Sequence, residues 1–307
     1  MIRRREHVSA KEISERFCLF LEHEGKSPLT IKNYRCDIER YVRLVESQKG
    51  KEFSLGDIGP NYLRRYRESL IQGLKAGSTN RKLAAIKGFV RWAADSSLLK
   101  TPDVSELGNV EFMRKERSRP RWLEPGEQGR LLRAVEAGGI TKDVAAIKLL
   151  LYTGIRALEL CELRWTAVSI SGDEGMLSLA SSRPLKEARA RVPLILEARN
   201  ALISLGYGHH SGKDQFVFTG RSGPMTRRGV DVLADRYSRI AGIKNVTPGM
   251  LRHSFCMNLV NAGVSPYTIA SLIGNGSMEM IRCYYVPQRG DEVPVSMLTP
   301  VEGLAGR

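Results

Sequence analysis

The amino-acid sequence predicts a mainly α protein of the α+β class, in which a helical domain precedes a mostly helical domain with a small antiparallel sheet. The 307 residues suit two domains better than one. Apolar residues recur at helical spacing over most of residues 9–100 and 122–285. Strand signals are confined to three short segments, among them Met176–Ala180 and Ala190–Leu194.

Start signals predict four helices in the first domain. The Ser9–Glu12 segment fits a capping box at the start of the first helix, and Ser27-Pro28 separates this helix from the second. A third helix is predicted from about Pro60, and Ser78-Thr79-Asn80 predicts the start of the fourth. We therefore expect a helical domain over residues 1–106.

The charge balance favours a polyanionic partner. The chain carries 48 Lys and Arg against 33 Asp and Glu, a net charge of +15, and each neutralised phosphate releases condensed counterions. The predicted fourth helix has a basic polar face, for which contact with the DNA backbone is the functional interpretation and a solvated surface the alternative. The candidate DNA contacts on this face and just before it are Lys75, Arg81, Lys82, Lys87 and Arg91.

Residues 107–121 are predicted to be a basic linker between the domains. They offer no apolar face to bury, so the segment is expected to be exposed. Its candidate DNA contacts are Arg117, Arg119 and Arg121. The second domain is expected over residues 122–285, and residues 286–307 form a tail.

Other features narrow the class of protein. No apolar run approaches the ~20 residues that cross a bilayer, and the basic N-terminus lacks the apolar core of a signal peptide. Five scattered cysteines, none in a C-x-x-C pair, indicate reduced thiols and no zinc site. We expect a cytoplasmic, nucleoid-associated protein that uses no metal and no cofactor.

Two segments of the second domain carry residues suited to phosphodiester chemistry. Breaking this bond without losing its energy requires a protein nucleophile, and a tyrosine phenol, with an ordinary pKa of about 10, is a weak one. Guanidinium forks suit the charge that develops on the non-bridging oxygens, and a lysine can protonate the departing 5′ oxygen. The segments are Leu151–Leu160, which reads LYTGIRALEL, and Thr247–Tyr285.

Together these segments resemble the signature of the tyrosine recombinase (phage integrase) family, of the simple two-domain type. The separations from Arg252 to Asn275 and from Asn275 to Tyr284 both match the family pattern. The resemblance implies that Tyr284 is the nucleophile, with the adjacent Tyr285 as the alternative. It also implies that the helical first domain is a core-binding domain and the second the catalytic domain.

The resemblance assigns further roles by position. Arg156 and Arg252 are expected to bind the phosphate, and Glu159 is expected to orient Arg156 from the same helical face. Lys186, in the turn of the predicted hairpin, is the expected general acid. A solvated loop lysine is the alternative there.

Two positions depart from the family pattern. Gly249 stands where the family usually has histidine, and Asn275 where it usually has histidine or tryptophan. Gly249 has no side chain, so proton transfer or phosphate contact made there by histidine is lost, at a typical cost of about 10²–10⁴ in rate. Asn275 keeps a hydrogen-bond donor. His253 is a candidate to compensate, although in the family this histidine mostly supports the site.

The implied function is site-specific recombination of double-stranded DNA for integration, excision or resolution. It runs through a 3′-phosphotyrosine, a free 5′-hydroxyl and a Holliday junction. The implied assembly is a homotetramer on two inverted-repeat sites, with each chain clamped around duplex DNA; accessory DNA-bending proteins are left open. Three alternatives remain: a catalytically impaired relative that binds specific DNA, a type IB topoisomerase, and a metal-dependent nuclease or transposase.

Overall fold

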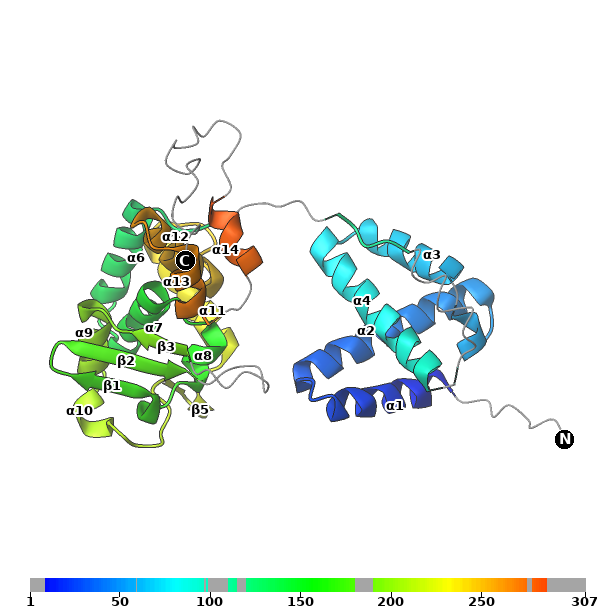
Figure 1. Cartoon of the computed structure of the whole chain (residues 1–307), viewed down its shortest axis with the longest axis horizontal. Helices are drawn as coiled ribbons and strands as arrows, with labels where there is room; N and C mark the ends of the chain where they lie inside the picture. Colours follow the sequence, from blue (N-terminus) through cyan, green and yellow to red (C-terminus); the bar gives the residue numbers. More distant parts are fainter. Residues whose placement is uncertain are drawn as a thin grey trace, which may run out of the picture. The chain divides into compact units, whose positions relative to one another are not determined.

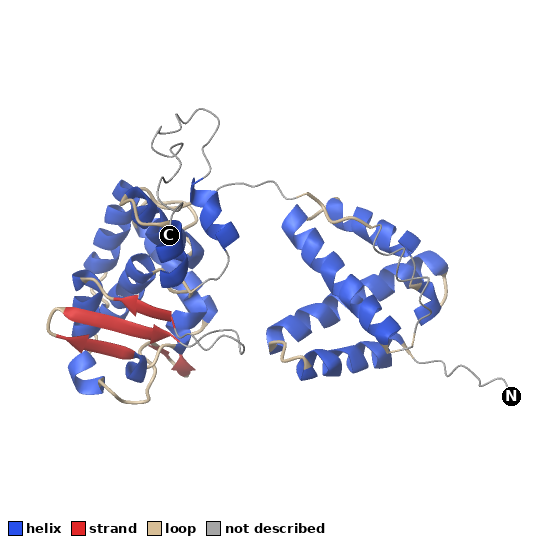
Figure 2. Cartoon of the chain, viewed as in Figure 1, coloured by secondary structure: helices blue, strands red, loops and turns tan. Residues whose placement is uncertain are grey.

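A computed structural model describes residues 9–58, 60–96, 98, 110–114, 120–179, 190–274 and 278–285. The chain divides into two compact units, Met1–Glu116 and Arg117–Arg307 (Figure 1). The first unit is helical, and the second is mostly helical with small antiparallel sheets (Figure 2). The predicted fold class is therefore confirmed.

The described part of the first unit holds four α-helices and one short 3-10 helix. The Ser9 side chain caps the first helix by accepting a hydrogen bond from the backbone N–H of Glu12 at 3.2 Å, as the sequence predicts. Ser27 caps the second helix in the same way. The elements are α1 (Ala10–His23), α2 (Pro28–Lys49), η1 (Leu55–Asp57), α3 (Pro60–Ile71) and α4 (Ala76–Asp95).

The fourth helix begins earlier than the sequence predicts. It starts at Ala76 with Lys75 as its N-cap, so the prediction of a start at Ser78-Thr79-Asn80 is wrong. The Asn80 side chain does not cap the helix, because it bonds the backbone of Met113. Its amide donates to the Met113 carbonyl at 2.8 Å, and its oxygen accepts from the Met113 N–H at 2.7 Å.

Residues 110–114 belong to the first unit, and the first of them packs in its core. Val110 is only 2% exposed and belongs to this unit's core, and Arg67 Nε donates to the Glu111 carbonyl at 3.0 Å. The prediction that the linker buries no apolar surface is therefore wrong for its described N-terminal part. The sequence does not reveal this contact, because a single buried valine forms no periodic apolar pattern.

The first described helix of the second unit is α6, which begins at Pro125. Gly154, in the left-handed conformation, ends α7. The elements in order are α6 (Pro125–Ala137), α7 (Thr141–Thr153), α8 (Ala157–Glu162), η2 (Trp165–Ala167), β1 (Val168–Ser171), β2 (Glu174–Leu179), β3 (Ala190–Pro193), α9 (Leu196–Ser204), α10 (Tyr207–His210), β4 (Thr219–Gly220), β5 (Gly223–Pro224), α11 (Arg227–Ile240), α12 (Pro248–Asn261), α13 (Pro266–Leu272) and α14 (Met278–Tyr285).

Strands β1, β2 and β3 form one antiparallel sheet in that order, drawn as red arrows in Figure 2. Leu177 of β2 lies opposite Val168 of β1 and Val192 of β3, and all three side chains are buried. They join the main core of the unit, in which α7 contributes a run of buried leucines. The predicted hairpin is confirmed, because Leu179 pairs with Ala190 across β2 and β3.

A separate small cluster of buried side chains lies at the C-terminal end of the described chain. Its members come from α12, α13, α14 and the residue after α13, and a partly buried Trp122 packs against them. This cluster holds the tyrosine expected to act as the nucleophile. The buried members are Cys256, Met257, Ile269, Ile273, Ile281 and Tyr284.

None of the five cysteines, all of which lie in the described part of the chain, forms a disulfide. Within the described ranges, no helix has the length and apolar character needed to cross a membrane.

Candidate active site

Arg252 is held in a buried position on α12 by two backbone carbonyls. Its side chain is 7% exposed. Nη1 donates to the Gly154 carbonyl at 2.5 Å, and Nη2 donates to the Ile273 carbonyl at 2.7 Å. The Gly154 carbonyl follows α7, and the Ile273 carbonyl follows α13. Two segments that are far apart in the sequence therefore fix the orientation of the Arg252 guanidinium.

The position that accepts the first of these hydrogen bonds, Gly154, requires glycine. Its φ is +63°, in the left-handed region that favours glycine. An added Cβ would lie 2.3 Å from Cδ1 of Phe255, the ring three residues after Arg252. Backbone conformation and packing therefore both exclude a side chain at this position.

We expect Gly154→Ala to lower the free energy of unfolding by about 2–4 kcal/mol, since the left-handed conformation and the overpacked ring each add a cost. Gly139→Ala is the matched control, because Gly139 has φ +67° but nothing within 4 Å of an added Cβ. It should lose only about 1 kcal/mol. Chemical denaturation of the full chain measures both, and equal losses would contradict this account.

Arg156 is positioned by Glu159 through two hydrogen bonds. The Glu159 carboxylate accepts from the backbone N–H of Arg156 at 2.6 Å and from its Nη1 at 2.5 Å. The first bond caps α8, since Arg156 is the N-cap of this helix. The second orients the guanidinium, whose side chain remains 34% exposed. One carboxylate thus starts the helix and directs the arginine.

The two guanidiniums are close enough to affect each other. Burial, and then the charge of Arg156, lower the pKa of Arg252, while Glu159 and Tyr284 act in the opposite direction. The two guanidiniums and the single Glu159 carboxylate leave a net positive charge at this partly buried site. A bound anion would offset this excess, so the arrangement suits a phosphate group.

Tyr284 lies near Arg252, and its hydroxyl contacts a histidine. The residue is 3% exposed, and its hydroxyl is hydrogen-bonded to Nδ1 of His253. The two ring centroids are 5.9 Å apart. Burial raises the pKa of Tyr284 well above its usual range, and the neighbouring Cys256 thiol adds to this effect. The phenol therefore keeps its proton at neutral pH and needs a base to become a nucleophile.

His253 is suited to accept that proton. Burial, and then the charge of Arg252, lower the pKa of His253 below its ordinary value of 6.5. The imidazole is therefore neutral at pH 7, with one ring nitrogen available as an acceptor. In the tautomer that carries its proton on Nε2, Nδ1 accepts the hydrogen bond that the Tyr284 hydroxyl donates.

Tyr285 is directed elsewhere. Its hydroxyl donates to the Val264 carbonyl at 2.9 Å. The structure thus gives the two adjacent tyrosines different surroundings, and only the hydroxyl of Tyr284 adjoins His253.

Four predicted site residues lie outside the described residues: Lys186, Asn275, Arg117 and Arg119. The hairpin strands that flank Lys186 are described, and so is Gly274, the residue before Asn275. Gly249 is exposed at the second position of α12.

The basic residues of α4 have partners within the first unit. Arg81 and Lys82 both bond the Asp37 carboxylate, which is 1% exposed, at 2.6 Å and 2.5 Å. Lys87 lies 4.7 Å from the ring centroid of Phe112. This face therefore contributes to the internal structure as well as to surface charge, a role that composition does not reveal.

The other candidate DNA contacts differ in their surroundings. Lys75 and Arg91 are exposed. Arg121 is also exposed, but its Nη1 donates to the Lys244 carbonyl at 2.9 Å and its Nη2 lies 3.6 Å from Glu127.

Sequence reasoning missed three contributors to the site. They are the Cys256 thiol beside the Tyr284 hydroxyl and the carbonyls of Gly154 and Ile273. Cys256 follows Arg252 by four residues on α12, so helical spacing was a usable signal. Backbone carbonyls carry no sequence signal.

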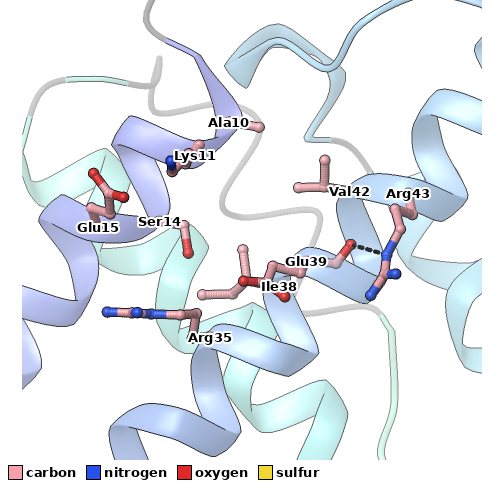
Figure 3. Close-up of a pocket in the computed structure, with 9 residues that line it drawn as sticks. All are labelled: Ala10, Lys11, Ser14, Glu15, Arg35, Ile38, Glu39, Val42 and Arg43. Carbon is pink, nitrogen blue, oxygen red and sulfur yellow. Dashed lines mark hydrogen bonds between the residues drawn. The ribbon is translucent and has the colours of Figure 1, made fainter.

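The first unit contains a groove of about 350 Å³ between α1 and α2 (Figure 3). The Ser14 hydroxyl is buried there without a hydrogen-bond partner among the described residues. Arg43 Nε donates to the Glu39 carbonyl at 3.3 Å. The groove contains none of the predicted catalytic residues. Its lining residues are Ala10, Lys11, Ser14, Glu15, Arg35, Ile38, Glu39, Val42 and Arg43.

Family models match both units. The model of the phage integrase family matches residues 121–289, and that of the phage integrase N-terminal SAM-like domain matches residues 15–96. The tyrosine recombinase XerC of Xylella fastidiosa (strain 9a5c) is 30% identical over 276 residues, which cover 87% of this chain and 90% of the relative. The tyrosine recombinase XerA of Thermococcus kodakarensis is 29% identical over 284 residues, covering 89% and 90%.

Solved structures share the fold. The Tn1549 transposon integrase in complex with a circular intermediate DNA has a TM-score of 0.71 at 19% identity, covering 95% of this chain and 99% of that one. A lambda integrase tetramer bound to a Holliday junction has a TM-score of 0.69 at 17% identity, covering 94% and 80%. At these identities the likeness concerns the fold alone.

Proposed function

The chain belongs to the phage integrase family of tyrosine recombinases, and from this premise we propose that it cleaves and rejoins DNA strands through a 3′-phosphotyrosine on Tyr284. Membership makes it a site-specific recombinase that acts on DNA. The observation that carries the finer proposal is the convergence of Arg156, Arg252 and the Tyr284–His253 pair. These groups supply a cationic phosphate site beside a phenol in contact with a base.

The proposed reaction is an in-line exchange of esters. The Tyr284 oxygen attacks phosphorus, the bond to the 5′ oxygen breaks, and a free 5′-hydroxyl leaves. Arg252, oriented by two carbonyls, and Arg156, oriented by Glu159, neutralise the charge that develops on the non-bridging oxygens. Because the covalent ester retains the bond energy, the strand can be rejoined without a further energy source.

Two further roles rest on the family resemblance. We assign Lys186 as the acid that protonates the departing 5′ oxygen. We assign Asn275 as a hydrogen-bond donor to the phosphate, in the place of the usual histidine or tryptophan.

The wider setting follows the same premise. Two molecules of duplex DNA, each carrying an inverted-repeat site, would be held by a homotetramer, and strands would be exchanged through a Holliday junction. The lambda integrase tetramer bound to a Holliday junction supports this assembly by its shared fold. The proposed domains are residues 1–106, a linker over 107–121, a catalytic domain over 122–285 and a tail over 286–307, in a cytoplasmic, nucleoid-associated protein.

The proposed DNA contacts combine exposed and internally paired cations. Lys75 and Arg91 are exposed on or next to α4, where charge is available to the phosphate backbone. Arg81, Lys82 and Lys87 would add charge close to the surface while also holding the first unit together. Arg117, Arg119 and Arg121 would contact the backbone from the linker.

Covalent capture tests the proposal. A DNA site is first selected by the protein from a randomised duplex pool, and a nicked duplex of that site then traps the cleaved strand. We expect an SDS-stable protein–DNA adduct in the presence of EDTA, with mass spectrometry placing the nucleotide on Tyr284.

Each other outcome overturns the proposal in a specific way. Binding without an adduct identifies a catalytically impaired DNA-binding relative. Loss of the adduct in EDTA indicates a metal-dependent nuclease or transposase, and relaxation of any supercoiled plasmid without the selected site indicates a topoisomerase. A nucleotide on Tyr285 rejects the assigned nucleophile.

A further inference from the structure

Gly249 and His253 lie one turn apart on the same face of α12. They are separated by four residues, the spacing at which helical side chains are neighbours. A histidine at position 249, which the family pattern usually has, would therefore share this face with His253. His253, one turn further along the helix, is therefore placed to take over the function lost at Gly249.

His253 already contacts the atom that must lose a proton. Its Nδ1 is hydrogen-bonded to the Tyr284 hydroxyl. Of the other groups near that hydroxyl, Arg252 is a cation and cannot accept a proton. Burial raises the pKa of the Cys256 thiol, which makes it a poor exchanger of protons at neutral pH. Among the described residues around Tyr284, the imidazole is the neutral base.

We propose that His253 is the general base of strand cleavage in this chain and replaces the histidine missing at Gly249. Its Nδ1 takes the proton of the Tyr284 hydroxyl as the oxygen–phosphorus bond forms. The bond from phosphorus to the 5′ oxygen breaks with its electron pair on that oxygen, which is protonated by the separate acid assigned to Lys186. On rejoining, the 5′-hydroxyl attacks, its proton passes to that acid, and His253 returns its proton to tyrosine. This inference rests on the proposed function.

The first test removes basicity while keeping a hydrogen bond. His253→Asn places an amide near the position of Nδ1, and His209→Asn is the matched control on an exposed histidine. With the selected nicked duplex under single-turnover conditions, we expect His253→Asn to form the adduct about 10²–10⁴-fold more slowly. DNA binding should be unchanged, and His209→Asn should react at the wild-type rate.

A pH profile separates a base from a residue that only positions Tyr284. Among the described residues, the charged or titratable groups that act on His253 are Arg252 on its own helix and Tyr284 on α14, whose hydroxyl also adjoins the Cys256 thiol. Because the pKa of His253 is lowered, the wild-type rate should hold down to pH about 6.5 and fall as the imidazole becomes protonated below it. The His253→Asn rate should lack this acid limb.

A gain of function completes the test. A Cβ added at Gly249 meets only Thr247 Oγ1, at 3.7 Å, and Gly249 is exposed, so the backbone leaves room for the first side-chain atom of Gly249→His. In the His253→Asn background, Gly249→His should raise the rate of adduct formation at least tenfold. Wild-type rate in His253→Asn, or an unchanged acid limb, overturns the inference while leaving the proposed function intact. Wild-type protein that forms no adduct overturns the proposed function itself.

A measurement without DNA keeps the inference testable if the variant fails to fold. In nitrogen-15 NMR of histidine-labelled wild-type protein, the Nδ1 of His253 should be an unprotonated acceptor, with the proton on Nε2. A proton on Nδ1 at pH 7 would make the imidazole a donor to tyrosine and would overturn the assignment.

Discussion

Tyr284→Phe is expected to abolish the covalent protein–DNA adduct while leaving DNA binding intact. Phenylalanine keeps the ring that packs in the small cluster of α12, α13 and α14, but it has no oxygen to attack phosphorus. The fold should survive, because the change removes only the hydroxyl, with its hydrogen bonds to His253 and the Cys256 thiol, and a typical hydrogen bond is worth about 1 kcal/mol.

Tyr285→Phe is the matched control for this substitution. It also removes one tyrosine hydroxyl, in this case the donor to the Val264 carbonyl, from the next residue of the same helix. Its adduct should form at a rate close to that of wild type. Gel electrophoresis in SDS after incubation with the nicked duplex measures both variants. An adduct in Tyr284→Phe, or its loss in Tyr285→Phe alone, would show that the nucleophile has been assigned to the wrong residue.

Arg252→Lys is expected to slow adduct formation by about 10²–10³, the typical cost of one lost donor to a developing oxyanion. Lysine preserves the charge. It cannot, however, donate to the Gly154 and Ile273 carbonyls from two separate nitrogens as the guanidinium does, and it offers phosphate no planar fork. The rate should therefore fall even though the formal charge at the site is unchanged.

Single-turnover kinetics with the selected nicked duplex measure this loss. Arg282→Lys is the control, because Arg282 is an exposed arginine on α14, and it should react at the wild-type rate. Circular dichroism shows whether the second unit remains folded, since leaving buried carbonyls unpaired costs about 1–3 kcal/mol. A folded Arg252→Lys variant within a few-fold of wild type would show that charge alone is sufficient.

Local signals explain why parts of the fold were predictable from sequence. The Ser9 and Ser27 caps act within three residues, so the starts of α1 and α2 can be read directly. The β2–β3 hairpin was predictable for a similar reason, since its two strands are close in the chain. The spacing of Arg252 and Tyr284 was informative because the resemblance gave it a reference pattern.

Contacts between distant residues account for what the sequence did not reveal. Asn80 looks like a helix cap, yet its amide is bound by the backbone of Met113. Arg81 and Lys82 look like free surface charge, but both bond Asp37, more than forty residues away. The anchoring of Arg252 depends on carbonyls, which every residue has, so only the tertiary structure selects Gly154 and Ile273.

The cluster that contains Tyr284 is distinct from the main core of its unit. Small satellite clusters open with less free energy than the core they adjoin. Heating can therefore release α13 and α14 while the leucine-rich α7 and the sheet stay folded. A heated sample would then retain most of its circular dichroism signal after the packing around Tyr284 is lost. For this protein, the fraction of molecules competent in catalysis, determined by active-site titration, is a better measure of sample quality than a melting temperature.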